Sequence, residues 1–579
     1  MRRFVKISGQ NRIPFWVILL VLIVLVVGIA GHEVWTPDEP REAAIARTMA
    51  CGESWLIPEL GGQPFVEKPP LYYWVSALMM RSLASVTSPT TAVRAVSALC
   101  AALTLLVVWL VVRSFWGRLR GGAVILIMGT AFGFVRAGHW IIIDPLLMLL
   151  ITSATLLLFL GLDRERGSAV LAGYLAAGLA FLTKGFVAWM LLFLPWGLLL
   201  VLYFRTIRRR PRLHLSGLLL LLGPSAVWMA AFYLQGGPEL WREWFIDNQI
   251  GRFTGGSTHL GHLKGPFYYL WLAPVALMPW TPIIIDWLIR RGWRSGGGGD
   301  NKGSRNLLLL IIFWGVGGLI LLSLASTKRE VYFYPLIPAF AILSAAGSDD
   351  LSLWVRMVLR IICAPLLAIM VIFSFLILDW TGSELIWRIG FNLPCGLGAA
   401  AGILSFIFFS NPASDSVTGN RSCRTISCLA SISALFFITA SLIALPLLDK
   451  VWSYKPMTLA LAAAIPASAR NRVCLWGNDE TTQGVFSYYS NLTLPMVEDP
   501  DRVIGILKGD DSEFDLIVIP RLNEFEEKNP AAPEWKTLAK AKKGRRRVFY
   551  LIGGELGMDR SGAVGSSNEP QNIEYRMSK

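Results

Sequence analysis

The residues that could do chemistry are concentrated in one stretch of the chain, between positions 36 and 70. This stretch is charged and interrupted by prolines, although only 16% of all residues are charged, and it follows directly on an apolar run. Ionisable groups beside a bilayer are costly unless they are paired or hydrated, so such a cluster indicates a functional site. The alternative is an amphipathic surface loop. The charged residues in question are Asp38, Glu39, Arg41, Glu42, Glu67 and Lys68. Asp38, Glu67 and Lys68 are candidate catalytic residues, and Glu39 and Arg41 are candidate substrate-binding residues.

Two acids stand next to apolar segments. Asp38 precedes a segment with helical spacing, and Asp144 precedes a proline and a long apolar run. Each could be the first-turn acid of a helix, where a carboxylate satisfies free backbone amides. Because both fall at the outer ends of separate predicted spans, we expect them to share a site.

Two lysines have the position expected of phosphate-binding cations. Glu67 and Lys68 precede two prolines, which fix their own φ and restrict the residue before them. A lysine on a stiff turn presents a compact positive charge that suits a phosphate. Lys184 interrupts an apolar stretch between two adjoining spans. It could simply extend to the membrane interface, but the short turn favours a cation that faces a cavity.

Two later segments, 241–269 and 326–335, combine basic groups with aromatic rings. This combination suits a phosphorylated amphiphile, because rings can pack on a sugar or line a lipid cleft while cations meet the phosphate. The candidate substrate-binding residues here are Arg252, Lys328, Tyr332 and Tyr334. No cofactor is implied by a motif; a divalent metal would have Glu67, His259 and His262 as candidate ligands, although two histidines without further ligands are weak evidence.

The composition defines the elements that must position these residues. The chain has 579 residues, is 54% hydrophobic, and contains many apolar runs. Such runs are long enough to cross a hydrocarbon core of ~30 Å, which predicts an α-helical polytopic membrane protein. The formal net charge of +15 lies largely in short loops between apolar runs, so it reports topology rather than nucleic-acid binding. Seven scattered cysteines argue against a disulfide framework.

Hydropathy predicts thirteen spans, with the first retained rather than cleaved as a signal peptide. If the N-terminus is inside, three basic loops, 113–120, 205–212 and 290–305, all fall on the cytoplasmic side. The candidate site residues and everything after residue 447 then lie outside. The spans are 14–31, 90–112, 121–138, 145–162, 168–183, 185–204, 214–233, 266–289, 306–324, 335–347, 357–379, 392–410 and 426–447.

Three parts of the chain are expected. Residues 1–450 form the transmembrane domain, in which the first outer loop, 31–89, contains aromatic-rich helices that lie in the interface. Residues 451–554 form a small α/β domain, because β-rich runs at 472–477, 514–520 and 547–554 alternate with helical stretches. Residues 555–579 are polar and predicted to be a disordered tail.

Several of these motifs occur together in a known superfamily. The first-loop sequence DEPREAAIARTM with VEKPPLYYW, then IDPLLM, LTKG and STKREVYFYPLIPAF, resembles the aminoarabinose transferase (ArnT-like) and protein-mannosyltransferase superfamily. The resemblance covers most of residues 30–345. It implies a membrane glycosyltransferase of the C-type fold (GT-C) with thirteen spans and a C-terminal periplasmic domain.

The resemblance also implies roles for single residues. Asp38 and Asp144 match the two acids of the family, Glu67 and Lys68 its EKPP pair, Lys184 its cavity lysine, and Tyr332 or Tyr334 the aromatic residue of its late loop. In aminoarabinose transferases the EKPP glutamate can share a metal with a histidine. Asn248 stands at the nearest position here, so the resemblance does not imply that metal.

The sequence therefore predicts an inverting glycosyltransferase of the bacterial inner membrane. It would move a sugar from a polyprenyl-phosphate donor to a periplasmic-side acceptor, which could be lipid A, an envelope glycan or a protein. Asp38 would be a general base for a hydroxyl acceptor, or would orient the substrate for a phosphate acceptor. The alternative is a transporter or flippase of lipid-linked sugars, since charged residues in polytopic proteins also mark substrate paths.

Overall fold

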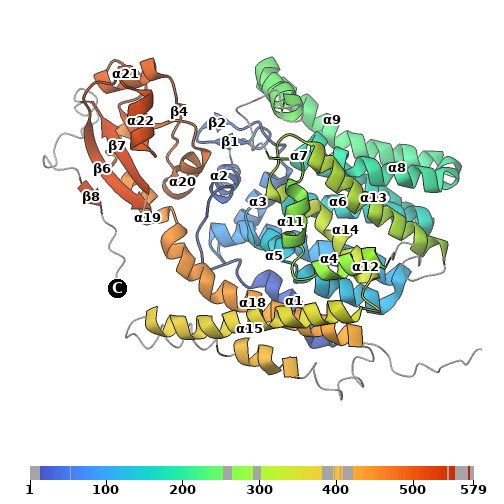
Figure 1. Cartoon of the computed structure of the whole chain (residues 1–579). Coiled ribbons are helices and arrows are strands. Elements are labelled where there is room, and N and C mark those ends of the chain that lie inside the picture. The colour runs from blue at the N-terminus through green and yellow to red at the C-terminus, as the bar shows by residue number, and fades with distance from the viewer. Residues whose placement is uncertain are drawn as a thin grey trace, which may run out of the picture. The chain divides into compact units, whose positions relative to one another are not determined.

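A computed structural model of the chain describes residues 13–52, 54–251, 264–290, 301–380, 396, 398–404, 406–407, 421–543, 547–554 and 571–573. The chain divides into two compact units (Figure 1). The first, called here the helical unit, comprises residues up to Ala30, Glu67–Tyr72 and Arg94–Ala444. The second, called the α/β unit, comprises Gly31–Val66, Tyr73–Val93 and Leu445–Lys579.

The helical unit consists mainly of long helices (Figure 1). Its described helices are α1 (Phe15–Val26), most of α4 (Pro89–Gly129), α5 (Phe132–His139), α6 (Asp144–Asp163), α7 (Gly167–Lys184), α8 (Phe186–Arg209), α9 (Pro211–Arg242), the π-helix η1 (Glu243–Gly251), α11 (Tyr268–Ala276), α12 (Thr281–Ile289), α13 (Lys302–Leu324), the 3-10 helix η3 (Glu330–Leu336), α14 (Ile337–Ala346), α15 (Leu353–Trp380) and most of α18 (Arg421–Trp452).

Eight helices in the described part of the chain are long and apolar enough to cross a membrane, or nine if the pair α11 and α12, bent by 114°, counts as one span. Helix α4 contains the predicted span 90–112 and part of 121–138, joined through non-helical backbone at Gly117. The predicted spans 14–31 and 335–347 correspond to shorter apolar helices. Of the predicted span 392–410, residues 396, 398–404 and 406–407 are described, and they are helical. The protein is a multi-pass membrane protein, as its composition predicts.

Helices α6 and α7 form a tight antiparallel hairpin because glycines line their contact. A Cβ on Gly173 would lie 2.8 Å from the backbone nitrogen of Leu158, and one on Gly161 would lie 2.6 Å from that of Val170. Small residues allow helix backbones to approach closely in membranes. The consequence is that the first residue of α6 comes to lie beside the last residue of α7.

The α/β unit contains a six-stranded mixed sheet with the strand order β4-β3-β5-β7-β6-β8. Strands β4, β3 and β5 are parallel, β7 is antiparallel to β5 and β6, and β8 is parallel to β6. The strands are β3 (Val473–Trp476), β4 (Met496–Val497), β5 (Leu516–Ile519), β6 (Lys536–Lys543), β7 (Arg547–Gly553) and β8 (Gln571–Ile573).

Helices connect these strands, and the first loop joins the same unit. The helices of the C-terminal part are α19 (Lys455–Ala464), η5 (Ala467–Ala469), α20 (Glu480–Ser490), α21 (Pro500–Lys508) and α22 (Leu522–Lys528). The helices predicted in the first loop are α2 (Glu39–Ala50) and α3 (Leu71–Ser82), with the short hairpin β1 (Glu59–Leu60) and β2 (Gln63–Pro64) between them. The first two residues of α3 belong to the helical unit.

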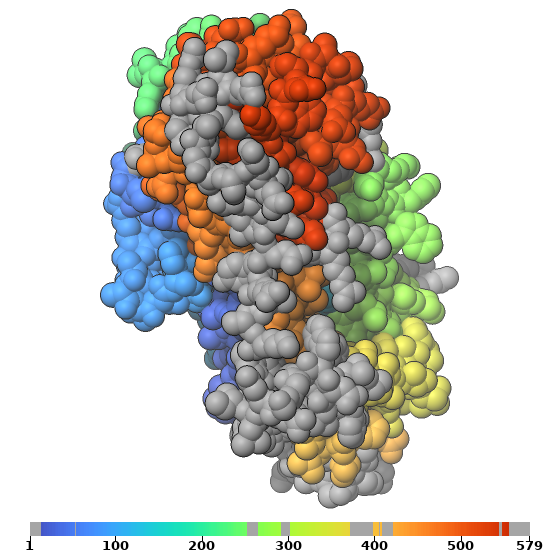
Figure 2. Space-filling view, turned by 90° about the vertical axis from the view of Figure 1, so that its left-hand side faces the viewer, coloured from blue at the N-terminus to red at the C-terminus, as the bar shows by residue number. Residues whose placement is uncertain are grey.

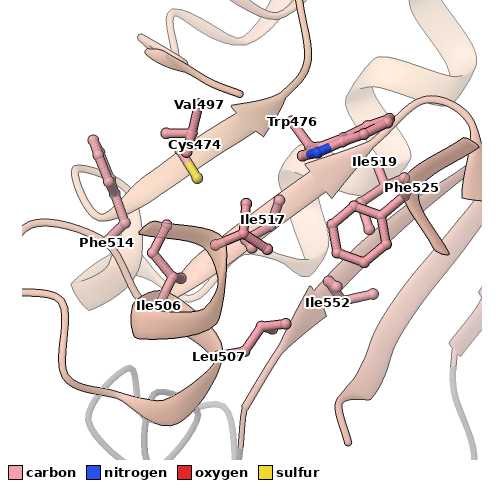
Figure 3. Close-up of a cluster of buried hydrophobic side chains, with 11 residues drawn as sticks. Cys474, Trp476, Val497, Ile506, Leu507, Phe514, Ile517, Ile519, Phe525 and Ile552 are labelled. Carbon is pink, nitrogen blue, oxygen red and sulfur yellow. The ribbon is translucent and has the colours of Figure 1, made fainter. Parts of the chain in front are cut away.

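One face of the sheet forms a hydrophobic core with α21 and α22 (Figure 3). Alternate residues of a strand point to the same face, so Cys474 and Trp476 of β3 lie beside Ile517 and Ile519 of β5. Ile506 of α21 packs on this face. Burying such side chains contributes roughly 1.5–3 kcal/mol each. Figure 2 shows the outer surface of this part of the chain in orange and red.

Candidate functional site

The α6–α7 hairpin brings together two residues that the sequence singles out. Lys184 Nζ lies 2.5 Å from Asp144 Oδ1, and the two side chains are 11% and 6% exposed. Asp144 is the first residue of α6 but makes no side-chain capping bond there, because Ile143 occupies the cap position. The pair is therefore a buried ion pair, and neither residue is explained by a simple helix start or by extension into solvent.

Tyr332 completes this cluster from the late loop. The ammonium of Lys184 lies 4.4 Å from the centroid of the Tyr332 ring, which is half-buried. Placed over a ring face, an ammonium group is attracted by the ring's negative face. The cluster of Asp144, Lys184 and Tyr332 (the Asp–Lys–Tyr cluster) thus combines one anion, one cation and one phenol. Tyr334, the other candidate in this segment, is buried at 3% exposure.

The late loop is held in place by residues that the sequence analysis did not identify. Arg136 of α5 pairs with Glu330 at 2.5 Å, and its guanidinium lies 4.4 Å from the ring centroid of Trp140. The hydroxyl of Tyr269 donates to the carbonyl oxygen of Arg329 at 3.0 Å. Arg136 stands in an otherwise apolar segment, which is the sequence signal that could have found it.

Lys328 lies in the same loop and donates to backbone carbonyls. Its Nζ is 3.1 Å from the carbonyl oxygen of Lys264, and it also contacts that of Ala325. Only 3% of the residue is exposed, and burial lowers the pKa of this ammonium. These bonds fix the loop, so Lys328 has a structural role besides the substrate contact that we predict.

Glu67 and Lys68 are both half-buried in the helical unit, just before two buried prolines. The carboxylate of Glu67 is close enough to Glu243 of η1 to interact with it electrostatically. Asn248 of the same helix is buried, and its amide donates to the carbonyl oxygen of Glu243 at 3.2 Å. The turn therefore lies near η1, the helix that carries Asn248.

Candidate metal ligands do not gather in the described part of the chain. Among those residues, no group of three or more histidine, cysteine, aspartate or glutamate side chains could hold a metal ion. His259 and His262 lie outside the described residues, as does the substrate-binding candidate Arg252. In that part of the chain Glu67 interacts electrostatically with Glu243, and no chemical step is assigned to a metal.

The acids and Arg41 of the first loop form a buried network in the α/β unit. Arg41 contacts Asp38 at 3.1 Å, Glu42 at 2.8 Å and Glu480 of α20 at 2.5 Å. The hydroxyl of Tyr73 donates to Glu42 at 2.6 Å. Asp38 occupies the N-cap position of α2 but makes no side-chain capping bond, so its carboxylate serves the network instead.

Glu39 belongs to the same helix start. Its carboxylate accepts a bond from the backbone nitrogen of Trp35 at 2.8 Å, and the residue is 1% exposed. Helices α2 and α20 approach so closely that a Cβ on Gly484 would lie 2.8 Å from the backbone of Pro40. The substrate-binding roles of Glu39 and Arg41 stay predictions, and the contacts show a structural role for both.

The fold defines the class of the protein. The structure is similar to the crystal structure of ArnT from Cupriavidus metallidurans bound to undecaprenyl phosphate, with a TM-score of 0.68, 21% identity, and coverage of 93% of this chain and 98% of the other. The same protein in the apo state matches with a TM-score of 0.68, 20% identity, and coverage of 96% and 99%. The chain has the GT-C fold predicted from its motifs.

Sequence comparison gives particular relatives. Residues 67–229 match the family model described as dolichyl-phosphate-mannose-protein mannosyltransferase. An undecaprenyl phosphate-alpha-4-amino-4-deoxy-L-arabinose arabinosyl transferase of Edwardsiella ictaluri is 32% identical over 58% of this chain and 60% of its own length. A protein of the same name from Pseudomonas paraeruginosa is 29% identical over 58% and 59%. The chain thus aligns with about 60% of the length of these relatives, and the resemblance read from the motifs is confirmed.

Proposed function

We propose that the protein is a glycosyltransferase that moves a sugar from a polyprenyl-phosphate donor to an acceptor on the periplasmic side of the bacterial inner membrane. The Asp–Lys–Tyr cluster carries this proposal, because it places a buried cation beside an acid and a phenol within a GT-C fold. Relatives named for undecaprenyl-phosphate-linked aminoarabinose make that donor the first one to test.

The transfer needs a cation that stabilises the negative charge on the leaving phosphate. In the transfer, the bond between the anomeric carbon and the phosphate oxygen breaks, the polyprenyl phosphate leaves with the electron pair, and the acceptor oxygen bonds to the opposite face of the anomeric carbon. Fixed cations stabilise the charge that develops on the leaving oxygen. Lys184 and Lys68 are our candidates for this role.

The acceptor determines whether a base is required. A hydroxyl must lose its proton, and we assign Asp38 as the base that receives it. A phosphate on lipid A is already ionised, and Asp38 would then orient the substrate. Asp144 is expected to hold Lys184 in position, because an ion pair at 2.5 Å fixes the ammonium.

The experiment is transfer of labelled sugar from a polyprenyl-phosphate donor in membranes that contain the Lys68→Ala or Asp38→Ala variant. One well-placed donor contributes about 3 kcal/mol, so we expect the rate to fall roughly a hundredfold for Lys68→Ala. Lys302→Ala, an exposed lysine at the start of α13, is the matched control and should keep full activity. Full activity of both site variants would remove the assignment of these residues.

A second measurement separates the transferase from the flippase. Proteoliposomes with fluorescent polyprenyl-phosphate sugar report lipid movement, and product analysis reports transfer. We expect transfer that depends on an acceptor. Lipid movement without any transfer would reverse the order of the two functions.

A further inference from the structure

A pocket of about 280 Å³ opens in the α/β unit, at the carboxyl ends of its parallel strands. Its walls come from the loops that follow β3, β4 and β5 and from one side of α22. No residue of the Asp–Lys–Tyr cluster or of the predicted transfer site takes part. The pocket is therefore a feature of the α/β unit that the proposed transfer does not use.

The order of the strands explains why a pocket forms at this place. From β3 the chain passes through α20 to β4 on one side, and then through α21 to β5 on the other side of β3. The loops after β3 and β5 thus leave neighbouring strands in opposite directions. In open α/β sheets such a reversal of strand order leaves a crevice beyond the carboxyl ends of the strands, and ligands bind there.

The local backbone keeps the mouth of this crevice open. Gly477 follows β3 with a φ of 82°, and a Cβ there would meet nothing within 4 Å. The turn allows Asp479 to cap α20, where it accepts from the backbone nitrogens of Thr481 at 3.1 Å and Thr482 at 3.2 Å. Asp479 is thus committed to the helix and gives the pocket a rigid edge.

The charges of the pocket are largely compensated by one another. Glu524 pairs with Arg521 at 2.8 Å and with Lys528 at 3.2 Å, all on or beside α22. With Asp479 and Glu498, the lining holds three carboxylates against two cations. This balance disfavours a phosphate or a nucleotide. The described residues hold no group of three metal-ligating side chains either, which disfavours a cation.

The remaining polar groups suit hydroxyls. Asn478 offers an amide that both donates and accepts, and Glu498 offers a carboxylate that accepts; both residues are exposed. The indole of Trp476 forms part of the wall, and Lys528 Nζ lies 5.9 Å from the centroid of its ring. A small concave site with an aromatic wall and a few polar groups is typical of small-molecule binding.

We infer that this pocket binds one saccharide ring, either neutral or carrying an amine. Ring hydroxyls would bond to Asn478 and Glu498 and to the charged pairs of α22, and an amine would be attracted by the excess carboxylate. A volume of about 280 Å³ limits the ligand to roughly one ring. The α/β unit thereby recognises a sugar by itself, whether or not the chain also transfers one.

The test is saturation-transfer NMR on the full chain in nanodiscs, without any donor lipid, with glucose, galactose, glucosamine and arabinose as separate probes. We expect saturation transfer from the protein to at least one sugar. The Asn478→Trp variant fills the pocket, so its saturation-transfer signal should be at least fivefold weaker. Glu498→Gln should reduce the signal of glucosamine more than that of the neutral sugars. Asn523→Trp, an exposed asparagine of α22 outside the pocket, is the matched control and should keep the signal.

Three results would overturn the inference: no saturation-transfer signal from any sugar, an equal signal in the Asn478→Trp variant, or displacement of the sugar by inorganic phosphate. The NMR experiment measures sugar binding and not glycosyl transfer. Failure of the proposed transferase activity would therefore leave its result intact. Conversely, if the pocket binds no sugar, the result of the labelled-sugar transfer assay is unchanged.

Discussion

Replacing Lys184 by methionine should destabilise the helical unit strongly. The substitution keeps most of the side-chain volume but removes the ammonium 2.5 Å from Asp144, whose side chain is only 6% exposed. Removing one partner of a buried ion pair costs about 3–5 kcal/mol, because the other charge stays buried. Losing the contact with the Tyr332 ring adds about 0.5–1 kcal/mol.

The double variant Asp144→Asn/Lys184→Met separates stability from chemistry. It removes both charges, so its free energy of unfolding should exceed that of Lys184→Met by at least ~1 kcal/mol, with a coupling energy of about 0.5–3 kcal/mol between the two sites. Sugar transfer should stay at least ~100-fold below that of the parent in both variants, because the cation is absent from each.

The assay is equilibrium unfolding of the purified chain in mixed micelles, together with transfer from a polyprenyl-phosphate donor. Stability effects of the two single variants that simply add would show that Asp144 and Lys184 are not coupled. Recovery of full transfer in the double variant would show that the ion pair only stabilises the fold, and would remove Lys184 from the proposed mechanism.

Further predictions concern the α/β unit. Gly484→Ala should lower the free energy of unfolding by about 1–3 kcal/mol in a thermal-unfolding assay, since the new Cβ would meet the Pro40 backbone at 2.8 Å. The control Gly505→Ala, with open space around it in α21, should be neutral or stabilise by up to ~1 kcal/mol. Arg41→Met should lower the free energy of unfolding by about 3–5 kcal/mol, because it removes a cation that contacts three carboxylates. Limited proteolysis should then cut the first loop faster, and an unchanged cleavage rate would contradict the network. Burial lowers the pKa of Lys543 to about 7. Above that pH the unfolded chain holds a proton on this lysine that the folded chain has lost, so the free energy of unfolding should rise from about pH 7 toward pH 10. That slope should be weaker in Lys543→Met, and an identical slope in both proteins would refute the assignment.

Two residues of the Asp–Lys–Tyr cluster stand out in the sequence because ionisable residues are rare in apolar runs. Asp144 and Lys184 stand alone in such runs, and each was identified by that contrast alone. Their direct pairing could not be predicted from the residues, because it depends on the glycine-lined contact between α6 and α7. Helix spacing shows which face is apolar, but not how closely two helices approach.

The parts of the fold that depend on distant residues were harder to predict. The strands at 472–477, 514–520 and 547–554 were predicted correctly as β3, β5 and β7, since buried strands read as continuous apolar runs. Strand β6 was missed because its lysine-rich sequence KTLAKAKK is depleted in strand-forming residues, and pairing with β7 overrides that preference. Arg41 gave no local sign of its partner Glu480.

The ion pair between Arg41 and Glu480 can form only late in the synthesis of the chain. The two residues are 439 positions apart in the chain. At a synthesis rate of about 5–20 residues per second, helix α2 is made roughly 20 to 90 seconds before α20 exists to cover it. During that interval Arg41 can contact Asp38 and Glu42 but not Glu480. A ribosome that stops before Glu480 would therefore release a chain whose first loop lacks the partner of Arg41, and proteases should cut that loop faster than in the full chain.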